Sequence, residues 1–251
     1  MPDSLTVVLP TLNEAGNIRR LAEGIWASVP DARILVCDDG SHDGTQERVR
    51  ELARQEWPIR LIARSGRPCL TASIQDGVDA ANTHWIAWMD ADLSHPPELL
   101  PRLLAAAQAG GCAIATRFAE GAKPKSAAGS VSESVLAVAL SNVLNFLVHR
   151  ILRLTITDYT SGFIVIRRDL LLRHRLVGDY GEYFIELMYW LASQGVVVAE
   201  VPYESPPRQW GDSKTGPNLR TLVRRGTRYL WLTLRLVLPR RPFGALSLRT
   251  R

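Results

Sequence analysis

Asp90 and Asp92 stand one residue apart, directly after the apolar run WIAWM and before the prolines at 96 and 97. If the strand continued through them, both carboxylates would point to the same side and could reach one cation or one polar ligand. Without a cation, two carboxylates held close together would repel each other. An isolated pair of this kind is more commonly a solvated turn with a helix cap, because Asp and Ser favour both places. The rest of the chain must decide between a metal site and a turn.

Short apolar runs alternate with helical patterns over residues 1–117. Strands are predicted at 5–10, 33–37, 59–63, 85–89 and 112–116, and helices at 13–28, 45–55, 71–82 and 96–109. This alternation predicts an α/β domain whose mostly parallel central sheet carries helices on both faces, with ligands bound at the carboxyl ends of the strands. Several polar or loop residues are expected just after those ends: Pro10, Asp38, Asp39, Asp90, Asp92 and Arg117.

The second half of the chain is less regular and ends in a basic tail. We predict loops at 119–130 and 206–217, helices at 131–154, 183–193 and 219–238, a turn at 158–163 that leads into a strand, and a strand at 196–203. Eleven Arg or Lys stand against a single acid, Asp212, from residue 208 onward. Such an excess suggests an anionic partner: nucleic acid, a phosphorylated substrate or a membrane surface. The last helix is basic and amphipathic, so it can lie on a membrane or be the solvated face of a packed helix.

Composition sets the broad class of the protein. Its 251 residues, 46% hydrophobic and 22% charged, fit a globular protein of one large or two small domains. The three cysteines lack metal-binding spacing, which argues against a zinc site or a disulfide framework and suits a reducing compartment. No signal peptide or transmembrane run is expected, and the five histidines are expected to be structural.

Seven segments, in family order, resemble glycosyltransferase family 2, the nucleotide-sugar enzymes of GT-A fold. Within that family the likeness is to the dolichyl-phosphate mannose synthases and related polyprenyl-phosphate glycosyltransferases. The segments are VVLPTLNEAGNI (7–18), CDDGSHDGT (37–45), MDADLSHPPELLP (89–101), ATRF (115–118), DYTSGF (158–163), AEVPY (199–203) and RQWGDSK (208–214). Each is weak alone, but together they favour the metal interpretation of the paired aspartates. The resemblance implies a GT-A (Rossmann-like) catalytic domain at 1–217 and a basic amphipathic helix and tail at 218–251.

The resemblance also implies a donor site. Asp90 and Asp92, with Ser94, would hold Mg²⁺ or Mn²⁺ against the diphosphate of the nucleotide sugar. Many relatives have Gln at the position of Ser94, whose hydroxyl can still ligate a cation or bond to it through water. The remaining residues matched to the nucleotide-sugar site are Pro10, Leu12, Glu14, Cys37, Asp39 and Ala91. Relatives often have Tyr at the position of Leu12. A leucine at this place offers no aromatic ring to stack on the base.

Three cations match positions that contact phosphates in the family, namely Arg117, Arg208 and Lys214. They belong to the expected nucleotide-sugar site and join Asp92 as the candidate catalytic residues. On the acceptor side Ser141 matches, whereas Ala137 stands where relatives usually carry Arg. Either Lys123 or Lys125 compensates for that change, or the acceptor differs. Glu186 matches a helix acid of the family, and we expect it to be structural.

The expected activity is therefore an inverting, metal-dependent transfer of one sugar, mannose from GDP-mannose, to a polyprenyl or dolichyl phosphate. We expect the enzyme to act in the cytoplasm, on the surface of a membrane. Another nucleotide sugar such as UDP-glucose, or a hydroxyl acceptor, remains open. A hydroxyl acceptor would need a carboxylate base, whereas a phosphate monoester is already anionic. A nucleic-acid partner is not expected, because the chain lacks the aromatic and basic interleaving of RNA-binding sheets.

Overall fold

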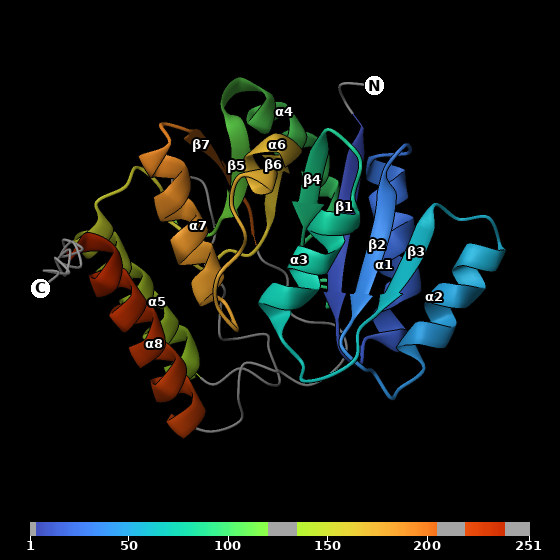
Figure 1. The fold of residues 1–251 in the computed structure, drawn as a ribbon, viewed down its shortest axis with the longest axis horizontal. Helices are drawn as coiled ribbons and strands as arrows, with labels where there is room; N and C mark the ends of the chain where they lie inside the picture. Colours follow the sequence, from blue (N-terminus) through green and yellow to red (C-terminus); the bar gives the residue numbers. More distant parts are fainter. Residues whose placement is uncertain (1–3, 120–134, 205–218, 239–251) are drawn as a thin grey trace, which may run out of the picture.

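The computed structural model describes residues 4–119, 135–204 and 219–238; for 135–141, 219–223 and 225 it describes the backbone only. A seven-stranded sheet forms the centre, with strand order β3-β2-β1-β4-β6-β5-β7 (Figure 1). The strands are β1 (Leu5–Thr11), β2 (Arg33–Asp38), β3 (Ile59–Ala63), β4 (Trp85–Trp88), β5 (Gly111–Thr116), β6 (Ile164–Arg167) and β7 (Val197–Pro202).

The short strand β6 joins two parallel parts of the sheet. On one side, β1 pairs in parallel with β2 and β4, and β2 pairs in parallel with β3. On the other side, β5 pairs in parallel with β7. Between them β6 runs antiparallel to both β4 and β5, so that Ile164 lies opposite Trp88 and Ile114. The predicted mostly parallel sheet is confirmed.

Helices cover both faces of the sheet, because successive strand residues point to opposite sides. Leu5, Val7 and Leu9 of β1 are buried under one layer of helices, whereas Val8 faces the other layer. The first layer comprises α1 (Ala15–Ser28), α2 (Thr45–Arg54), the 3-10 turn η1 (Pro97–Leu99) and α4 (Leu100–Gly110). The second comprises α3 (Leu70–Ala80), α5 (Val135–Leu152), α6 (Arg168–Leu172), α7 (Glu182–Ser193) and α8 (Leu219–Val237).

The basic helix α8 packs on the domain. It lies beside α5, as Figure 1 shows, and also contacts α7. Its Thr233 is fully buried, and Tyr229 and Leu236 pack against the core. Among the helices in the described part of the chain, none is both long and apolar enough to span a membrane.

Most predicted elements are confirmed, with small shifts at their ends. The predicted strand at 85–89 ends at Trp88, the predicted helix at 96–109 begins as the turn η1, and the five-residue α6 was not predicted. Pro10 and Asp38 lie inside the ends of β1 and β2 instead of after them. Apart from Ala119, the predicted loops at 119–130 and 206–217 lie outside the described residues.

Candidate active site

Two loops at the carboxyl edge of the sheet, residues 12–14 between β1 and α1 and residues 39–44 between β2 and α2, are joined by hydrogen bonds that also include Thr45, the first residue of α2; we call them the donor loops. The Asn13 N–H donates to Ser41 Oγ (2.7 Å), and the His42 N–H donates to Asn13 Oδ1 (2.9 Å). The Glu14 N–H donates to Thr45 Oγ1 (2.9 Å). Asn13 has a φ of 55°, a left-handed conformation that Asn tolerates better than most residues. The donor loops therefore form one connected wall.

The neighbouring carboxylates of Asp38 and Asp39 bind different partners. The Asp38 side chain is fully buried and accepts hydrogen bonds from the backbone of Gly40 (3.2 Å) and Ser41 (3.0 Å) and from Gln46 Nε2 (2.6 Å). This is the turn-forming role that an Asp in a loop commonly takes. Asp38 therefore shapes the second donor loop, and Asp39 is the carboxylate at the edge of the site.

Asp39 is held from two sides. Its carboxylate accepts a hydrogen bond from Arg64 Nη1 and one from the Cys69 N–H (2.9 Å). Arg64 also donates from Nε to Asp76 (2.7 Å). Burial lowers the pKa of Arg64, but the hydrogen bond to Asp76 and the charge of Asp39 outweigh it, and the pKa is raised. Arg64 was not predicted as a site residue, although it directly follows the predicted strand at 59–63.

The paired aspartates lie beyond the end of β4, so the strand does not continue through them and its alternation does not align the two carboxylates. Asp90 is exposed, whereas Asp92 is 4% exposed. The Asp90 N–H donates to His95 Nδ1 (3.0 Å), and Asp92 Oδ1 accepts from the Ser94 N–H (2.9 Å). Leu93 adopts a φ of 64°, which is unusual for a leucine and turns the chain sharply. A tight turn, held by its own side chains, therefore carries both carboxylates.

The oxygen donors of this turn fit a hard divalent cation. Carboxylate and hydroxyl oxygens are the ligands that Mg²⁺ and Mn²⁺ prefer. In the described part of the chain, no three His, Cys, Asp or Glu side chains gather into a metal site. Two carboxylates and a nearby hydroxyl suit a cation that takes its other ligands from a bound diphosphate and water. The donor set of this turn therefore fits the implied metal.

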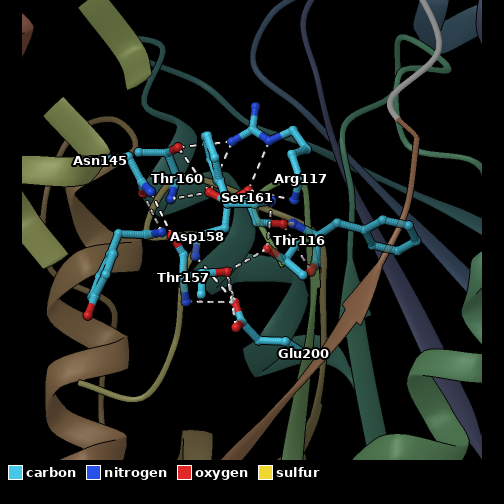
Figure 2. Close-up of polar contacts among 11 residues, drawn as sticks. Thr116, Arg117, Asn145, Thr157, Asp158, Thr160, Ser161 and Glu200 are labelled. Carbon is cyan, nitrogen blue, oxygen red and sulfur yellow. Dashed lines mark hydrogen bonds and ion pairs between the residues drawn. The ribbon is translucent and has the colours of Figure 1, made fainter. Parts of the chain in front are cut away.

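Arg117, at the end of β5, is bound to a buried carboxylate (Figure 2). Its Nε and Nη2 donate to the two oxygens of Asp158 (2.9 and 3.0 Å), and Nη2 also donates to Thr160 Oγ1 (2.9 Å). Asp158 is fully buried. Burial lowers the pKa of Arg117, but the charge of Asp158 and the hydrogen bond to it, with the charge of Asp90, raise it above its ordinary value. A permanent positive charge is therefore fixed near the aspartate turn.

The turn that carries Asp158 is anchored by two other elements. Glu200 of β7 accepts from the backbone N–H groups of Thr157 (2.8 Å) and Asp158 (3.2 Å). Asn145 of α5 contacts the same turn from the other side, as Figure 2 shows. The sequence predicted a turn here but gave no sign of these partners, which lie 12 to 43 residues away in the chain.

The other candidate residues fall into three groups. Pro10 and Leu12 are half-buried at the edge, and Glu14 is buried and accepts from Asn17 Nδ2 (2.7 Å). Ala91 and Cys37 are buried, and burial, more than the charge of Asp76, raises the pKa of the Cys37 thiol to about 12. Arg208, Lys214 and the side chain of Ser141 lie outside what the structure describes.

Glu186 Oε2 and His174 Nε2 lie at hydrogen-bond distance (2.7 Å), and the ring of His174 stacks on Trp190. These contacts join α7 to the segment that precedes it, and a structural role for Glu186 stays a prediction.

The parallel sheet, the donor loops and the aspartate turn at one edge define a glycosyltransferase of GT-A fold. Solved structures support the fold: glucosyl-3-phosphoglycerate synthase from Mycobacterium tuberculosis, crystallised with Mn²⁺, UDP and glucosyl-3-phosphoglycerate, matches with a TM-score of 0.68 at 17% identity, covering 94% of this chain and 81% of that one. The family profile of glycosyl transferase family 2 matches residues 6–175, and the chain belongs to this family.

Two characterised relatives extend the comparison. Polyprenol monophosphomannose synthase from Mycolicibacterium smegmatis is 34% identical over 224 residues, which are 85% of this chain and 82% of that protein. Dolichol-phosphate mannosyltransferase from Pyrococcus furiosus is 28% identical over 221 residues, but the match spans only 58% of its length.

Proposed function

We propose that this glycosyltransferase moves mannose from GDP-mannose to a polyprenyl or dolichyl phosphate, with inversion at the sugar. The observation that carries the proposal is the likeness to the Mycolicibacterium smegmatis polyprenol monophosphomannose synthase, which extends over most of both chains. The Pyrococcus furiosus dolichol-phosphate mannosyltransferase supports the same chemistry.

On the donor side, the nucleotide lies against the donor loops, with Asp39 toward the base and ribose. Asp90 and Asp92, with Ser94, hold Mg²⁺ or Mn²⁺. When bound, the cation neutralises charge on the diphosphate as it leaves. Arg64 fixes the carboxylate of Asp39, and the backbone near Cys37 completes this end of the site. Arg208 and Lys214 bring further positive charge to the phosphates.

On the acceptor side, the lipid phosphate approaches Arg117. A phosphate oxygen attacks the anomeric carbon, the bond from that carbon to the donor phosphate breaks, and the nucleoside diphosphate leaves with the electron pair. The attacking oxygen is already anionic at neutral pH, so no side chain has to take a proton. Two anions must meet during this reaction, and fixed cations lower their repulsion in a partly dry site. Within the described residues, Nη1 of Arg117 makes no hydrogen bond and is the nitrogen we assign to the acceptor phosphate.

A membrane surface would present this acceptor, and α8 with α5 has the composition to meet it. The exposed side of α8 carries Trp231, Leu234 and Leu238 beside Arg224, Arg228 and Arg235. Helix α5 exposes Val143, Phe146 and Leu147. Apolar side chains next to arginines suit the boundary between lipid headgroups and acyl chains. We propose that α5 and α8 hold the enzyme on the cytoplasmic surface of a membrane as a peripheral protein.

Replacing Trp231 and Leu234 together by alanine is expected to lower the affinity for anionic lipid vesicles by about tenfold or more, because each exposed apolar side chain contributes about a kcal/mol or more on insertion. Co-sedimentation with vesicles at low and high salt measures this. High salt should weaken binding further, since the arginines act by screened charge. The matched control is Val197→Ala, which removes an exposed apolar side chain from β7. Equal vesicle binding by the double variant and the control would contradict the role of α8.

The activity is tested with labelled nucleotide sugars and a polyprenyl phosphate, each with and without EDTA. GDP-mannose should give a product that partitions into organic solvent, and EDTA should remove it. Replacing GDP-mannose by UDP-glucose tests which base and which sugar the enzyme accepts. The absence of a metal-dependent lipid product with every nucleotide sugar would refute the proposal.

A hydroxyl acceptor is the second candidate. The observation that favours it is Ala137, which replaces the arginine that relatives usually carry near the acceptor phosphate. Labelled product that stays in the aqueous phase, with no lipid-linked sugar, would favour this alternative.

A further inference from the structure

Asn145 clamps the turn that carries Asp158. It lies on α5 and is only 5% exposed. Its Nδ2 donates to the Thr157 carbonyl oxygen (2.6 Å), and its Oδ1 accepts from the Tyr159 N–H (2.8 Å), as drawn in Figure 2. These two groups belong to the peptide units on either side of Asp158, so one amide side chain fixes the backbone of Asp158 at both ends.

Arg117 depends on that backbone for its orientation. Asp158 binds Nε and Nη2 of Arg117 side by side, which fixes the plane of the guanidinium. Asp158 also accepts from the Arg117 N–H (3.3 Å). Glu200 holds the turn from β7, but it reaches the N–H groups of Thr157 and Asp158, not the groups that Asn145 binds. Glu200 and Asn145 therefore hold different groups of the turn. From α5, Asn145 holds the two peptide groups that flank Asp158, and His149 contacts the Ile156 carbonyl oxygen just before them (3.1 Å).

The opposite side of α5 is open. Phe146, the residue next to Asn145, is 60% exposed, and Val143 is 54% exposed. Any displacement of α5 on a lipid surface would therefore reach the Asp158 turn through Asn145 and, one helical turn further on, through His149.

We propose that Asn145 is a positioning residue for the acceptor: it sets Arg117 relative to α5, the helix that faces the lipid. The inference rests on the proposed function, because it takes Arg117 to meet the acceptor phosphate. Loss of the Asn145 clamp should weaken binding of the acceptor without affecting binding of the nucleotide sugar. The donor loops lie on the other side of β6 from Arg117.

The test replaces Asn145 by aspartate, which has nearly the same shape. A carboxylate can still accept from the Tyr159 N–H, but it cannot donate to the Thr157 carbonyl. Protonation restores an O–H donor, so the defect should depend on pH. The titratable or charged groups around this position are Asp158, Glu200, Arg117, His149 and Tyr159. They are present in the wild type too, so each measurement is taken as a ratio to wild type at the same pH.

Kinetics are measured with GDP-mannose and a short, water-soluble polyprenyl phosphate, which removes membrane binding from the readout. In N145D the KM for the acceptor should rise about tenfold at about pH 8 and fall back toward wild type near about pH 5. The KM for the nucleotide sugar should stay within about twofold. The control N142D makes the same change at an exposed site on α5 and should leave both KM values unchanged. If N145D does not fold, N145S, whose short hydroxyl reaches at most one of the two peptide groups, should raise the KM for the acceptor alone.

Three results would overturn the inference. The first is an acceptor KM in the variants equal to that of wild type. The second is a loss of kcat with both KM values unchanged at every pH, which would mean a merely structural role. The third is an acceptor defect in N145D that low pH does not relieve. These results come from an active wild type and leave the proposed function standing. A wild type that makes no lipid product with any nucleotide sugar overturns both.

Discussion

Replacing Asp92 by alanine is expected to abolish sugar transfer while leaving the protein folded. The side chain lies in a turn, where it accepts a backbone hydrogen bond from Ser94, and its removal takes no apolar volume out of the core. Loss of a cation that neutralises the leaving diphosphate should raise the barrier by several kcal/mol, and about 4 kcal/mol corresponds to a rate loss of about a thousandfold. Initial-rate measurements at saturating Mg²⁺ or Mn²⁺, with thermal unfolding in parallel, check both parts.

Asp92→Asn separates charge from shape in this experiment. Asparagine can keep the bond from the Ser94 N–H but binds a hard cation much more weakly, so transfer should be lost and Mn²⁺ binding in the presence of GDP should fall with it. Asp31→Asn, an exposed aspartate between α1 and β2, is the control and should behave as wild type. Activity of Asp92→Ala within about tenfold of wild type, a barrier change of only about 1.4 kcal/mol, would show that Asp92 does not hold the metal.

Asp158→Asn should be the most destabilising single change at the site. It leaves the guanidinium of Arg117, whose side chain is 18% exposed, without its fully buried counterion, and breaking a largely buried pair in this way typically costs about 3–5 kcal/mol of the free energy of unfolding. For a chain of this size, the unfolding midpoint should fall by about 10 °C. Transfer should fall as well, since Arg117 loses its fixed orientation. Differential scanning calorimetry and initial rates measure the two effects.

An exposed pair on β6 and α6 gives the matched control. Arg167 donates to Asp169 through Nε (2.6 Å) and Nη2 (2.9 Å), but these side chains are 41% and 56% exposed. Asp169→Asn should therefore cost at most about 1 kcal/mol. Combining Arg117→Met with Asp158→Leu should recover much of the stability without recovering transfer, because apolar residues can replace a buried pair but cannot bind a phosphate. Transfer by that double variant at the wild-type rate would exclude Arg117 from the reaction.

The sequence predicts the first half of the fold well because its signals are local. Apolar runs of four to seven residues and amphipathic helices alternate there, and each element contacts the neighbours that a parallel sheet requires. The direction of β6 could not be predicted. The four residues of β6 do not indicate which strands it will pair with. Both partner strands, β4 and β5, are separated from β6 by 47 or more residues of the chain.

The candidate site, like the fold, could be predicted from the sequence only in part. The aspartates, the donor loops and Arg117 were found because motif residues follow predicted strands. Their geometry was not, since nothing in the sequence pattern predicted the turn at Leu93, which has a positive φ. The contacts of Arg64 with Asp39, of Arg117 with Asp158 and of Asn145 with the Thr157 backbone join segments far apart in sequence. Only the folded chain brings these partners together.

The place of β6 in the sheet also gives the protein an order of assembly during synthesis. The chain leaves the ribosome from its first residue, and the strands β3-β2-β1-β4 can pair with one another before anything later is made. Strand β5, which ends beside Arg117, pairs with β6 and β7 and with neither β1 nor β4. A nascent chain that has not reached residue 167 therefore carries the donor loops and the aspartate turn but has no sheet to hold Arg117 beside them. Helix α8, which covers α5, comes later still. Under the proposed function, the nascent enzyme acquires the loops assigned to the nucleotide before the segments assigned to sugar transfer and to the lipid.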